Sequence, residues 1–201
     1  MINYNQLLEE QLQQIKNYKL TPNLLLHSCC APCSSYVISY LTNYFNITIF
    51  YYNPNIYPIE EYEKRKQEQI KLIKKLKHTN KLNIIDCDYD NEIYKQKIKG
   101  LEKELEGGKR CYKCFELRLE KTAKIAKDNN FDYFSTTLTV SPHKNADILN
   151  EIGINFQNKY NIKWLYSNFK KKDGYKKSIE LSKKYNLYRQ NYCGCKYSKP
   201  E

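Results

Sequence analysis

The fold is decided by residues 24–33, Leu24-Leu-Leu-His-Ser-Cys-Cys-Ala-Pro-Cys33, in which an apolar run leads directly into a cysteine-rich turn. Residues 24–28 are expected to form a buried strand. Pro32 suits the first turn of a helix that should reach about Tyr44. A buried strand that feeds a helix through a short turn is the repeating unit of an α/β fold.

The same alternation continues along the chain. Further strands are expected at 47–52, 83–87, 132–137 and 162–166, and helices at 59–78, 91–99, 113–128, 145–158 and 174–186. This order implies right-handed crossovers and a mostly parallel sheet with helices on both faces. No internal repeat and no Pro/Gly/Ser-rich linker interrupts it, so we expect a single α/β domain over residues 1–201.

The charge of the chain is strongly positive. It has 201 residues, and 34 Lys and Arg against 22 Asp and Glu give a formal net charge of +12. Such an excess favours a polyanionic partner such as nucleic acid, although lysines also simply solvate helix faces. No apolar run approaches the roughly 18–20 residues that span a bilayer, and the N-terminus lacks an apolar signal core. The expected location is therefore cytoplasmic, with no membrane partner.

Eight cysteines are the most informative residues for function. They fall as Cys29-Cys30-x-x-Cys33, Cys87, Cys111-x-x-Cys114 and Cys193-x-Cys195. In a reducing compartment, clustered cysteines indicate metal or redox chemistry rather than structural disulfides.

The first cysteine group, Cys29, Cys30 and Cys33, directly follows the first strand. In parallel sheets, ligands bind beyond the carboxyl ends of the strands, and a helix start lowers the pKa of nearby thiols. We therefore predict a metal site at this edge of the sheet. The alternative is a buried pair of small apolar residues.

The second group opens a helix with Gly107-Gly-Lys-Arg-Cys-Tyr-Lys-Cys114. A Cys-x-x-Cys at a helix start serves zinc, iron–sulfur clusters and dithiol redox chemistry alike. With Cys29 and Cys30 it supplies four thiolates, a full set for a [4Fe–4S] cluster. Lys109 and Arg110 either place positive charge beside these thiolates or meet phosphate. Cys33 is either a ligand to an additional metal or simply a first-turn residue.

The third group, Cys193-Gly194-Cys195, has only one residue between its cysteines. Gly194 permits the unusual backbone of a small-ring disulfide, which favours a labile redox pair. The competing interpretation is that these thiols complete a second metal site. Cys87 is expected to be a core residue.

Other polar residues suggest a substrate site. His143, in a hydroxyl-rich loop, is a general-acid candidate or a solvated loop residue. His27 is expected to be a hydrogen-bonded core residue rather than a metal ligand. The turn at Asn53, with Tyr62 and Arg65 on the next helix, could form a substrate wall. No GxxxxGK[ST] or GxGxxG motif is present, so no nucleotide triphosphate or NAD site is inferred.

Several of these stretches together resemble the QueH-type epoxyqueuosine reductases. The runs that carry the resemblance are Leu24–Cys33, Tyr52–Ile56 with Glu61, Tyr62 and Arg65, Gly108–Arg118, Ser135–Asn145 and Tyr188–Cys195, in order over about residues 22–197. The resemblance implies an α/β fold related to the nucleotide α-hydrolases, which are Rossmann-like. It also implies reduction of epoxyqueuosine at the tRNA wobble position to queuosine.

The resemblance further implies a [4Fe–4S] cluster on Cys29, Cys30, Cys111 and Cys114 and a redox-active Cys193–Cys195 pair, with no cobalamin. A second iron near Cys33 could polarise the epoxide oxygen, and His143 or a tyrosine could protonate it. The implied partners are the anticodon arm of a tRNA and an electron donor that the sequence does not identify. Two alternatives remain at this point, a zinc-stabilised RNA-binding module and a cluster-free thiol–disulfide oxidoreductase.

Overall fold

A computed structural model describes residues 2–199 and shows one five-stranded sheet in which every strand is parallel to its neighbours. Its strands are β1 (Asn23–His27), β2 (Asn46–Phe50), β3 (Leu82–Ile85), β4 (Tyr133–Thr136) and β5 (Lys163–Trp164), in the order β3-β2-β1-β4-β5. This is a doubly wound, Rossmann-like arrangement. The predicted α/β class is confirmed, and the sheet is entirely parallel rather than mostly so.

Helices alternate with these strands. They are α1 (Tyr4–Asn17), α2 (Ala31–Leu41), α3 (Ile59–Lys75), α4 (Asn91–Lys97), α5 (Lys109–Asp128), α6 (Ala146–Tyr160) and α7 (Gly174–Lys184), with short 3-10 turns η1 (Thr137–Val140) and η2 (Lys196–Ser198). Helix α5 begins four residues earlier than the predicted residue 113. Both cysteines of the second group therefore lie within its first two turns.

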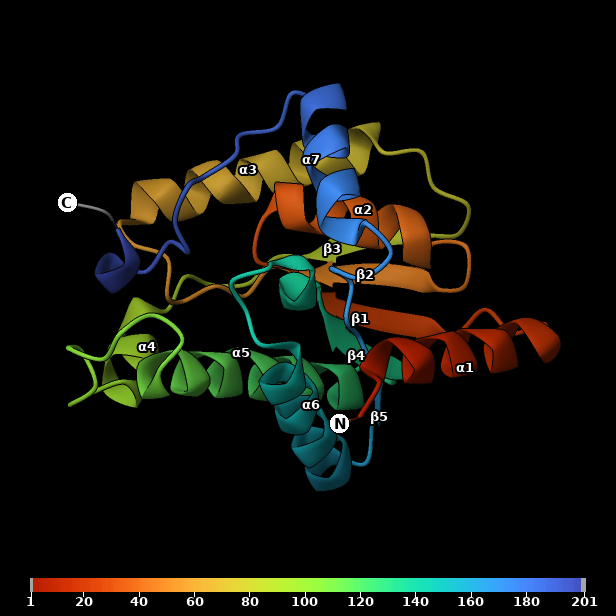
Figure 1. Ribbon diagram of the computed structural model, residues 1–201, viewed down its shortest axis with the longest axis horizontal. Coiled ribbons are helices and arrows are strands. Elements are labelled where there is room, and N and C mark those ends of the chain that lie inside the picture. The colour runs from red at the N-terminus through yellow and green to blue at the C-terminus, as the bar shows by residue number, and fades with distance from the viewer. Residues whose placement is uncertain (1, 200–201) are drawn as a thin grey trace.

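The two faces of the sheet carry separate apolar clusters. Leu24 and Leu26 of β1 pack into the cluster formed with α1, α2 and α3, whereas Leu25 packs into the cluster formed with α5 and α6. This alternation is the period of two that a strand imposes on its side chains. Figure 1 shows α2, α3 and α7 on one side of the sheet and α5 and α6 on the other.

Helix α1 was not predicted from the sequence. Its buried Tyr4, Leu8, Leu12 and Ile15 recur at spacings of three and four residues, so its apolar face was present in the sequence. The side chain of Gln11 on this helix donates to Trp164 O and accepts from Tyr166 N, at 3.0 Å in both cases. Helix α1 thus satisfies backbone groups at the short edge strand β5, where an open edge invites unwanted pairing.

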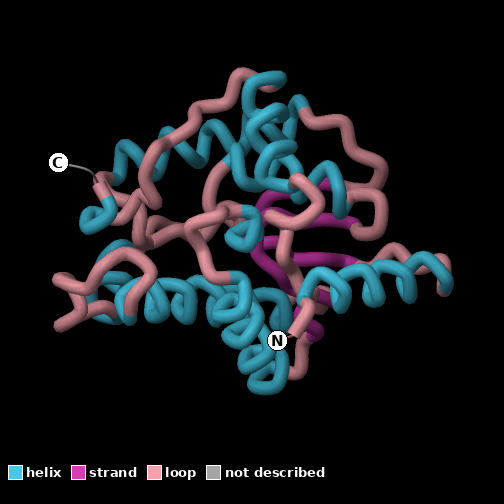
Figure 2. The backbone as a smooth tube through the Cα atoms, viewed as in Figure 1, coloured by secondary structure: helices cyan, strands magenta, loops and turns pink. Residues whose placement is uncertain are grey.

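The chain changes direction across the sheet between β1 and β4. Strands β2 and β3 lie on one side of β1, and β4 and β5 lie on the other. Ligands of doubly wound sheets bind outside the carboxyl ends at such a switch point. The loops that follow the strands and the C-terminal segment gather at this end of the sheet (Figure 2). No helix within residues 2–199 is both long enough and apolar enough to cross a bilayer.

Candidate active site

The first cysteine group lies at the switch point. The sulfur atoms of Cys29, Cys30 and Cys33 lie within 4.8 Å of one another, the only group of three or more potential metal-binding side chains of this kind in residues 2–199. The Sγ atoms of Cys29 and Cys30 are 3.7 Å apart. The Cys29 N–H donates to Thr137 Oγ1, just beyond β4, at 3.4 Å. The predicted cysteine-rich site at the carboxyl edge of the sheet is confirmed as a geometric feature.

Two adjoining cavities bring the other cysteines to the same place. The larger, of about 740 Å³, is lined by Cys29, Cys33 and Cys193, and the smaller, of about 110 Å³, by Cys111, Cys114, Cys193 and Cys195. Cys193 lines both. Six of the eight cysteines therefore line the cavities, and a seventh, Cys30, contacts Cys29. Three sequence segments more than 70 residues apart converge here.

The eighth cysteine stands apart. Cys87 is half-buried beyond the end of β3, lines neither cavity, and donates its thiol proton to Tyr51 O at 2.8 Å. It is thus a hydrogen-bonded packing residue, close to the expected core position, and serves as an internal control for the other seven.

Within the first group, one thiol ionises most readily. The pKa of Cys29 lies well below its usual value because the thiols of Cys30 and Cys33 donate hydrogen bonds to it, with further help from Lys144 and Arg118. The same arrangement raises the pKa of Cys33 and raises that of Cys30 to about 12. Without a metal, the group therefore holds one thiolate shared among three sulfurs.

In the second group, burial raises the pKa of Cys111 and brings that of Cys114 to about 12. These thiols stay protonated unless a cation compensates the charge. A metal ion provides such compensation because its ligands bind as thiolates.

A buried arginine already lies beneath these sulfurs. Arg118 on α5 is 1% exposed, and its guanidinium donates to Asn53 Oδ1 at 2.7 Å and to Cys114 Sγ at 3.8 Å. It makes no ion pair with a carboxylate in the described part of the chain. An uncompensated buried charge is strongly unfavourable, so thiolates are the counter-charge that this site offers.

His27 supports the arginine from the end of β1. Burial, and then the charge of Arg118, lower the pKa of His27 to about 3, so the imidazole is neutral. The Arg118 Nε–H donates to His27 Nε2 at 3.2 Å, which places the imidazole proton on Nδ1, 2.8 Å from Thr136 Oγ1. The expectation of a hydrogen-bonded core histidine is confirmed.

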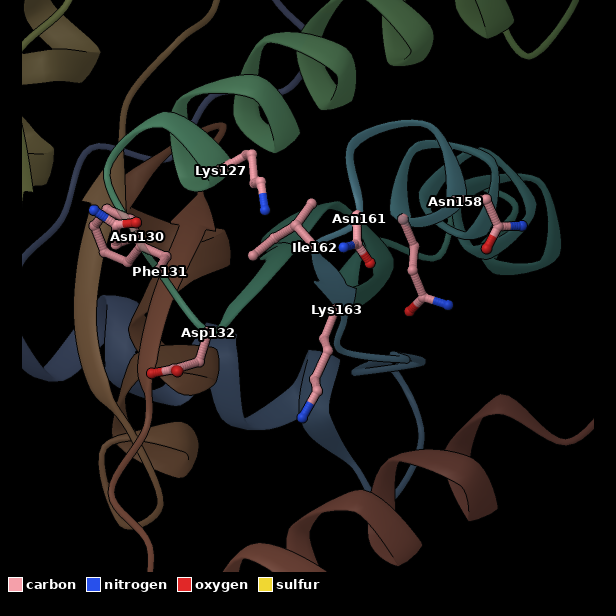
Figure 3. Close-up of a pocket in the computed structure, with 9 residues that line it drawn as sticks. Lys127, Asn130, Phe131, Asp132, Asn158, Asn161, Ile162 and Lys163 are labelled. Atoms are coloured by element: carbon pink, nitrogen blue, oxygen red, sulfur yellow. The ribbon is translucent and has the colours of Figure 1, made fainter.

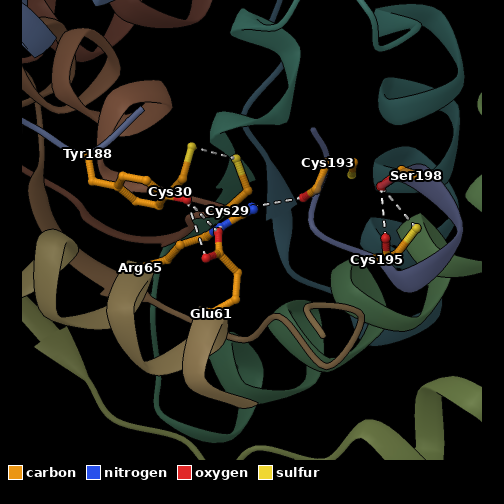
Figure 4. Close-up of polar contacts among 8 residues, drawn as sticks. All are labelled: Cys29, Cys30, Glu61, Arg65, Tyr188, Cys193, Cys195 and Ser198. Carbon is orange, nitrogen blue, oxygen red and sulfur yellow. Dashed lines mark hydrogen bonds and ion pairs between the residues drawn. The ribbon is translucent and has the colours of Figure 1, made fainter. Parts of the chain in front are cut away.

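The third cysteine group is held by a different arginine (Figure 4). Arg65 on α3 is 2% exposed, pairs with Glu61 through Nε at 2.6 Å, and donates from Nη1 to Cys193 O at 3.0 Å. Gly194 has φ of +111°, and a Cβ there would lie 2.7 Å from Arg65 Nη1. The glycine is therefore needed both for its backbone conformation and for the close approach of Arg65.

Some of the remaining predicted site residues line the cavities, and others do not. Asn53 lines the larger cavity and donates to Ser28 O at 2.8 Å. His143 is exposed and lines both cavities. Neither Tyr62 nor Arg65 lines a cavity, and Tyr62 is buried with its hydroxyl 3.3 Å from Cys87 O.

The two basic residues at the start of α5 also differ in their exposure. Lys109 is exposed, whereas Arg110 is 2% exposed and donates to the backbone carbonyls of Glu102 and Glu104. We therefore treat Arg65, Arg110 and Tyr62 as residues that position the site rather than as direct substrate contacts.

Sequence reasoning missed Arg118 and Arg189, which line the larger cavity, and it also missed the two charged residues that line both cavities, Glu106 and Lys144. Burial lowers the pKa of Lys144, but Cys193, Cys29 and Cys33 raise it by more, so the ammonium stays charged. Both residues adjoin segments that the sequence did single out, Lys144 next to His143 and Glu106 next to Gly107. Only the fold shows that these two segments face one another.

A separate surface hollow lies at the opposite edge of the sheet (Figure 3). It is lined by residues at the amino ends of β4 and β5, among them Lys127, Asp132, Asn161 and Lys163, and it contains no cysteine. The Asp132 carboxylate already accepts the Asn23 N–H at 2.7 Å. With no nucleophile or metal-binding cluster, this hollow is a weaker candidate than the cysteine-lined cavities.

Comparison with known proteins agrees with the site. Residues 24–201 match the family model described as epoxyqueuosine reductase QueH. A Streptococcus pyogenes protein of that name is 41% identical over 199 residues, covering 98% of this chain and 78% of the relative. A Staphylococcus epidermidis protein of that name is 43% identical, covering 98% and 84%. One from Thermotoga maritima is 38% identical, covering 87% and 89%.

Proposed function

The chain belongs to the epoxyqueuosine reductase QueH family and is an oxidoreductase of that kind, and from this premise we propose that it reduces epoxyqueuosine at the wobble position of tRNA with a cysteine-bound iron–sulfur cluster. The observation that carries the proposal is the convergence of seven cysteines above a buried arginine that has no carboxylate partner among residues 2–199. Such a site favours bound thiolates over neutral thiols.

The cysteines present fit the proposed cofactor. Cys29, Cys30, Cys111 and Cys114 would hold a [4Fe–4S] cluster, and Cys33 lies beside them for a second iron. When bound, the cluster supplies electrons one at a time, and a second iron supplies a Lewis acid. Seven sulfurs exceed the four that a cluster needs, which leaves Cys193 and Cys195 for a different task.

We assign that task to a redox pair. Removing the epoxide oxygen as water consumes two electrons and two protons. Oxidation of the Cys193 and Cys195 thiols to a disulfide releases the same number of each, so one turnover balances as epoxide plus two thiols giving alkene, disulfide and water. A reduced electron donor must then restore the thiols. Cys193 lines both cavities, which suits a residue that exchanges electrons with substrate and cofactor.

His143 is the proposed proton donor to the epoxide oxygen. It lines both cavities, and its backbone N–H donates to Ser141 Oγ at 3.3 Å, which helps to fix the loop that carries the imidazole. Lys144 beside it supplies a fixed positive charge where the departing oxygen becomes negative.

The tRNA is proposed to bind across the mouth of the cavities. The net charge of +12 would attract it, and exposed Lys109 and Arg189 lie on segments that border the site. Binding through phosphate contacts should weaken steeply with salt. We further propose that residues 1–201 act as one cytoplasmic domain, since segments from both halves of the chain build the cavities.

The test combines metal analysis with variants. Protein purified without oxygen should contain about four iron and four sulfide per chain, and any iron beyond four would indicate the second site. Cys111→Ser and Cys114→Ser should lose the cluster and the activity, whereas Cys87→Ser should keep both, since a serine hydroxyl can still donate to Tyr51 O. Zinc without sulfide, or full activity in both α5 variants, would overturn the cluster assignment.

A further inference from the structure

Glu106 is the only carboxylate that lines either cysteine cavity within the described residues. The other charged side chains that line them are the Cys29 thiolate and the cations Arg118, Lys144 and Arg189. Glu106 accepts no hydrogen bond through its side chain and makes no ion pair with any described residue. A carboxylate that lines both cavities and pairs with no described cation is available for a ligand.

The backbone on both sides of Glu106 is fixed. On one side, the buried Arg110 guanidinium binds the carbonyls of Glu102 and Glu104. On the other, Gly107 adopts φ of +90°, and its N–H donates to Cys111 Sγ at 3.2 Å. The loop therefore holds Glu106 directly beside a proposed cluster ligand, and the burial of Arg110 has a functional reason.

The negative charge of Glu106 is opposite in sign to the net charge of the protein. The protein carries a net charge of +12 and is proposed to bind a polyanion, so a carboxylate at the mouth of the site weakens general attraction to phosphate. The same carboxylate strengthens binding of a ligand that brings a localised positive charge into the cavity. The site thus fits a cationic group carried on an anionic molecule.

The proposed substrate has such a group. Epoxyqueuosine carries its epoxide ring on a secondary alkylamine attached to a 7-deazaguanine base, and an alkylamine is protonated at neutral pH. Building on the proposed function, we propose that Glu106 binds this ammonium group and thereby distinguishes the modified nucleotide from guanosine. The ring attached to the amine is then kept at the cysteine-lined side of the cavity, since Glu106 adjoins the segment that contacts Cys111.

The test measures tRNA affinity rather than turnover. The iron-loaded wild-type protein, Glu106→Gln and the control Glu102→Gln are each titrated with two forms of one tRNA, with epoxyqueuosine or with guanosine at the wobble position. Glu102 lies on the same exposed loop and contributes only its backbone carbonyl to Arg110. Iron and sulfide are measured in all three proteins.

We expect Glu106→Gln to lose about tenfold in affinity for the modified tRNA, as for a partly exposed charge-assisted contact, with no loss for the unmodified form. Glu102→Gln should retain the full preference, and all three should hold equal iron. If Glu106→Gln still preferred the modified tRNA as strongly as the wild-type protein does, the inference about Glu106 would be overturned and the proposed function would stand. Loss of iron in that variant would also overturn the inference, by making Glu106 a metal ligand. A wild-type protein with no preference would overturn the proposed function as well.

Discussion

Two buried arginines, on opposite faces of the sheet, support the cysteine site in different ways. Arg65 on α3 is paired with Glu61 at 2.6 Å and holds the carbonyl of Cys193. Arg118 on α5 is just as buried but is bound only by Asn53, His27 and the thiol of Cys114. The charge of Arg65 is therefore balanced by a carboxylate, whereas that of Arg118 is balanced only by thiolates, namely the Cys29 thiolate in the metal-free protein and further cysteines when metal binds.

This difference separates folding from cofactor binding. The Arg65 region should be equally stable with and without metal, because its ion pair involves no sulfur. The Arg118 region should gain stability when metal converts the thiols to thiolates, since binding to the folded state alone stabilises that state.

The largest effect is expected from Arg65→Gln in the metal-free protein. It removes one member of a buried ion pair and leaves Glu61 without its partner, which should lower the free energy of unfolding by about 3 kcal/mol. Urea denaturation measures the loss. The double variant Arg65→Gln, Glu61→Gln should recover part of it, because no unpaired charge remains. Equal losses in the single and double variants would contradict the ion-pair account.

The next effect concerns pH and belongs to the Arg118 region. The folded pKa of His27 is about 3, below the unfolded value of about 6.5, so the folded state binds fewer protons. The resulting stability is present above about pH 6.5 and is lost as the pH falls toward 3. Between pH 7 and pH 5 the metal-free protein should lose about 2 kcal/mol.

The control for this prediction is His27→Gln, which has no imidazole to protonate. Its free energy of unfolding should change far less between pH 7 and pH 5 than that of the wild-type protein. If both proteins show the same pH dependence, the neutral buried state of His27 is not its source.

Most of the fold could be predicted from the sequence, and the reason lies in the strands. Leu24, Leu25 and Leu26 form an apolar run that ends in a turn with Pro32. This pattern is typical of a buried strand followed by a helix. Helix α1 was missed although Leu8, Leu12 and Ile15 mark its apolar face. It precedes the first strand, outside the strand–helix alternation on which the prediction relied.

The site could be predicted only for residues whose chemistry is unusual by itself. Adjacent cysteines at a strand end, in a chain with further clustered cysteines, point to metal or redox chemistry. Arg65 and Arg110 were instead assigned to substrate, because an arginine in a sequence gives no sign of whether its guanidinium faces solvent or a buried carbonyl. Arg118 and Glu106 were not considered, since their importance depends on which partners are absent around them.

An effect of similar size is expected from Gly194→Ala, which tests how the Arg65 region holds Cys193. The alanine would adopt φ near +111° and place its Cβ 2.7 Å from Arg65 Nη1, so unfolding should become easier by about 2 kcal/mol. Gly100→Ala is a matched control, because Gly100 also has positive φ but no atom within 4 Å of the added Cβ. The reductase activity should fall in Gly194→Ala only. Equal behaviour of both variants would show that Arg65 does not position the Cys193 loop.

The smallest effect on the metal-free protein is expected from Arg118→Gln, within about 1 kcal/mol. The glutamine amide nitrogen occupies the place of Arg118 Nε and can still donate to His27 Nε2, so the contact of His27 with Thr136 Oγ1 is kept. Asn53 Oδ1 loses its donor, but removing a buried charge that has no carboxylate partner offsets this loss.

The loaded protein should respond to Arg118→Gln in a different way. With the positive charge gone, the more negative, reduced state of the proposed cluster should be disfavoured about tenfold, equivalent to a one-electron potential lower by about 59 mV. Arg118→Lys, which keeps the charge, should stay near the wild-type potential. Spectroelectrochemical titration measures the potential, and denaturation of the metal-free variants measures stability. If metal-free Arg118→Gln were as unstable as Arg65→Gln, both arginines would be structural, and the charge of Arg118 would not depend on thiolates for its balance.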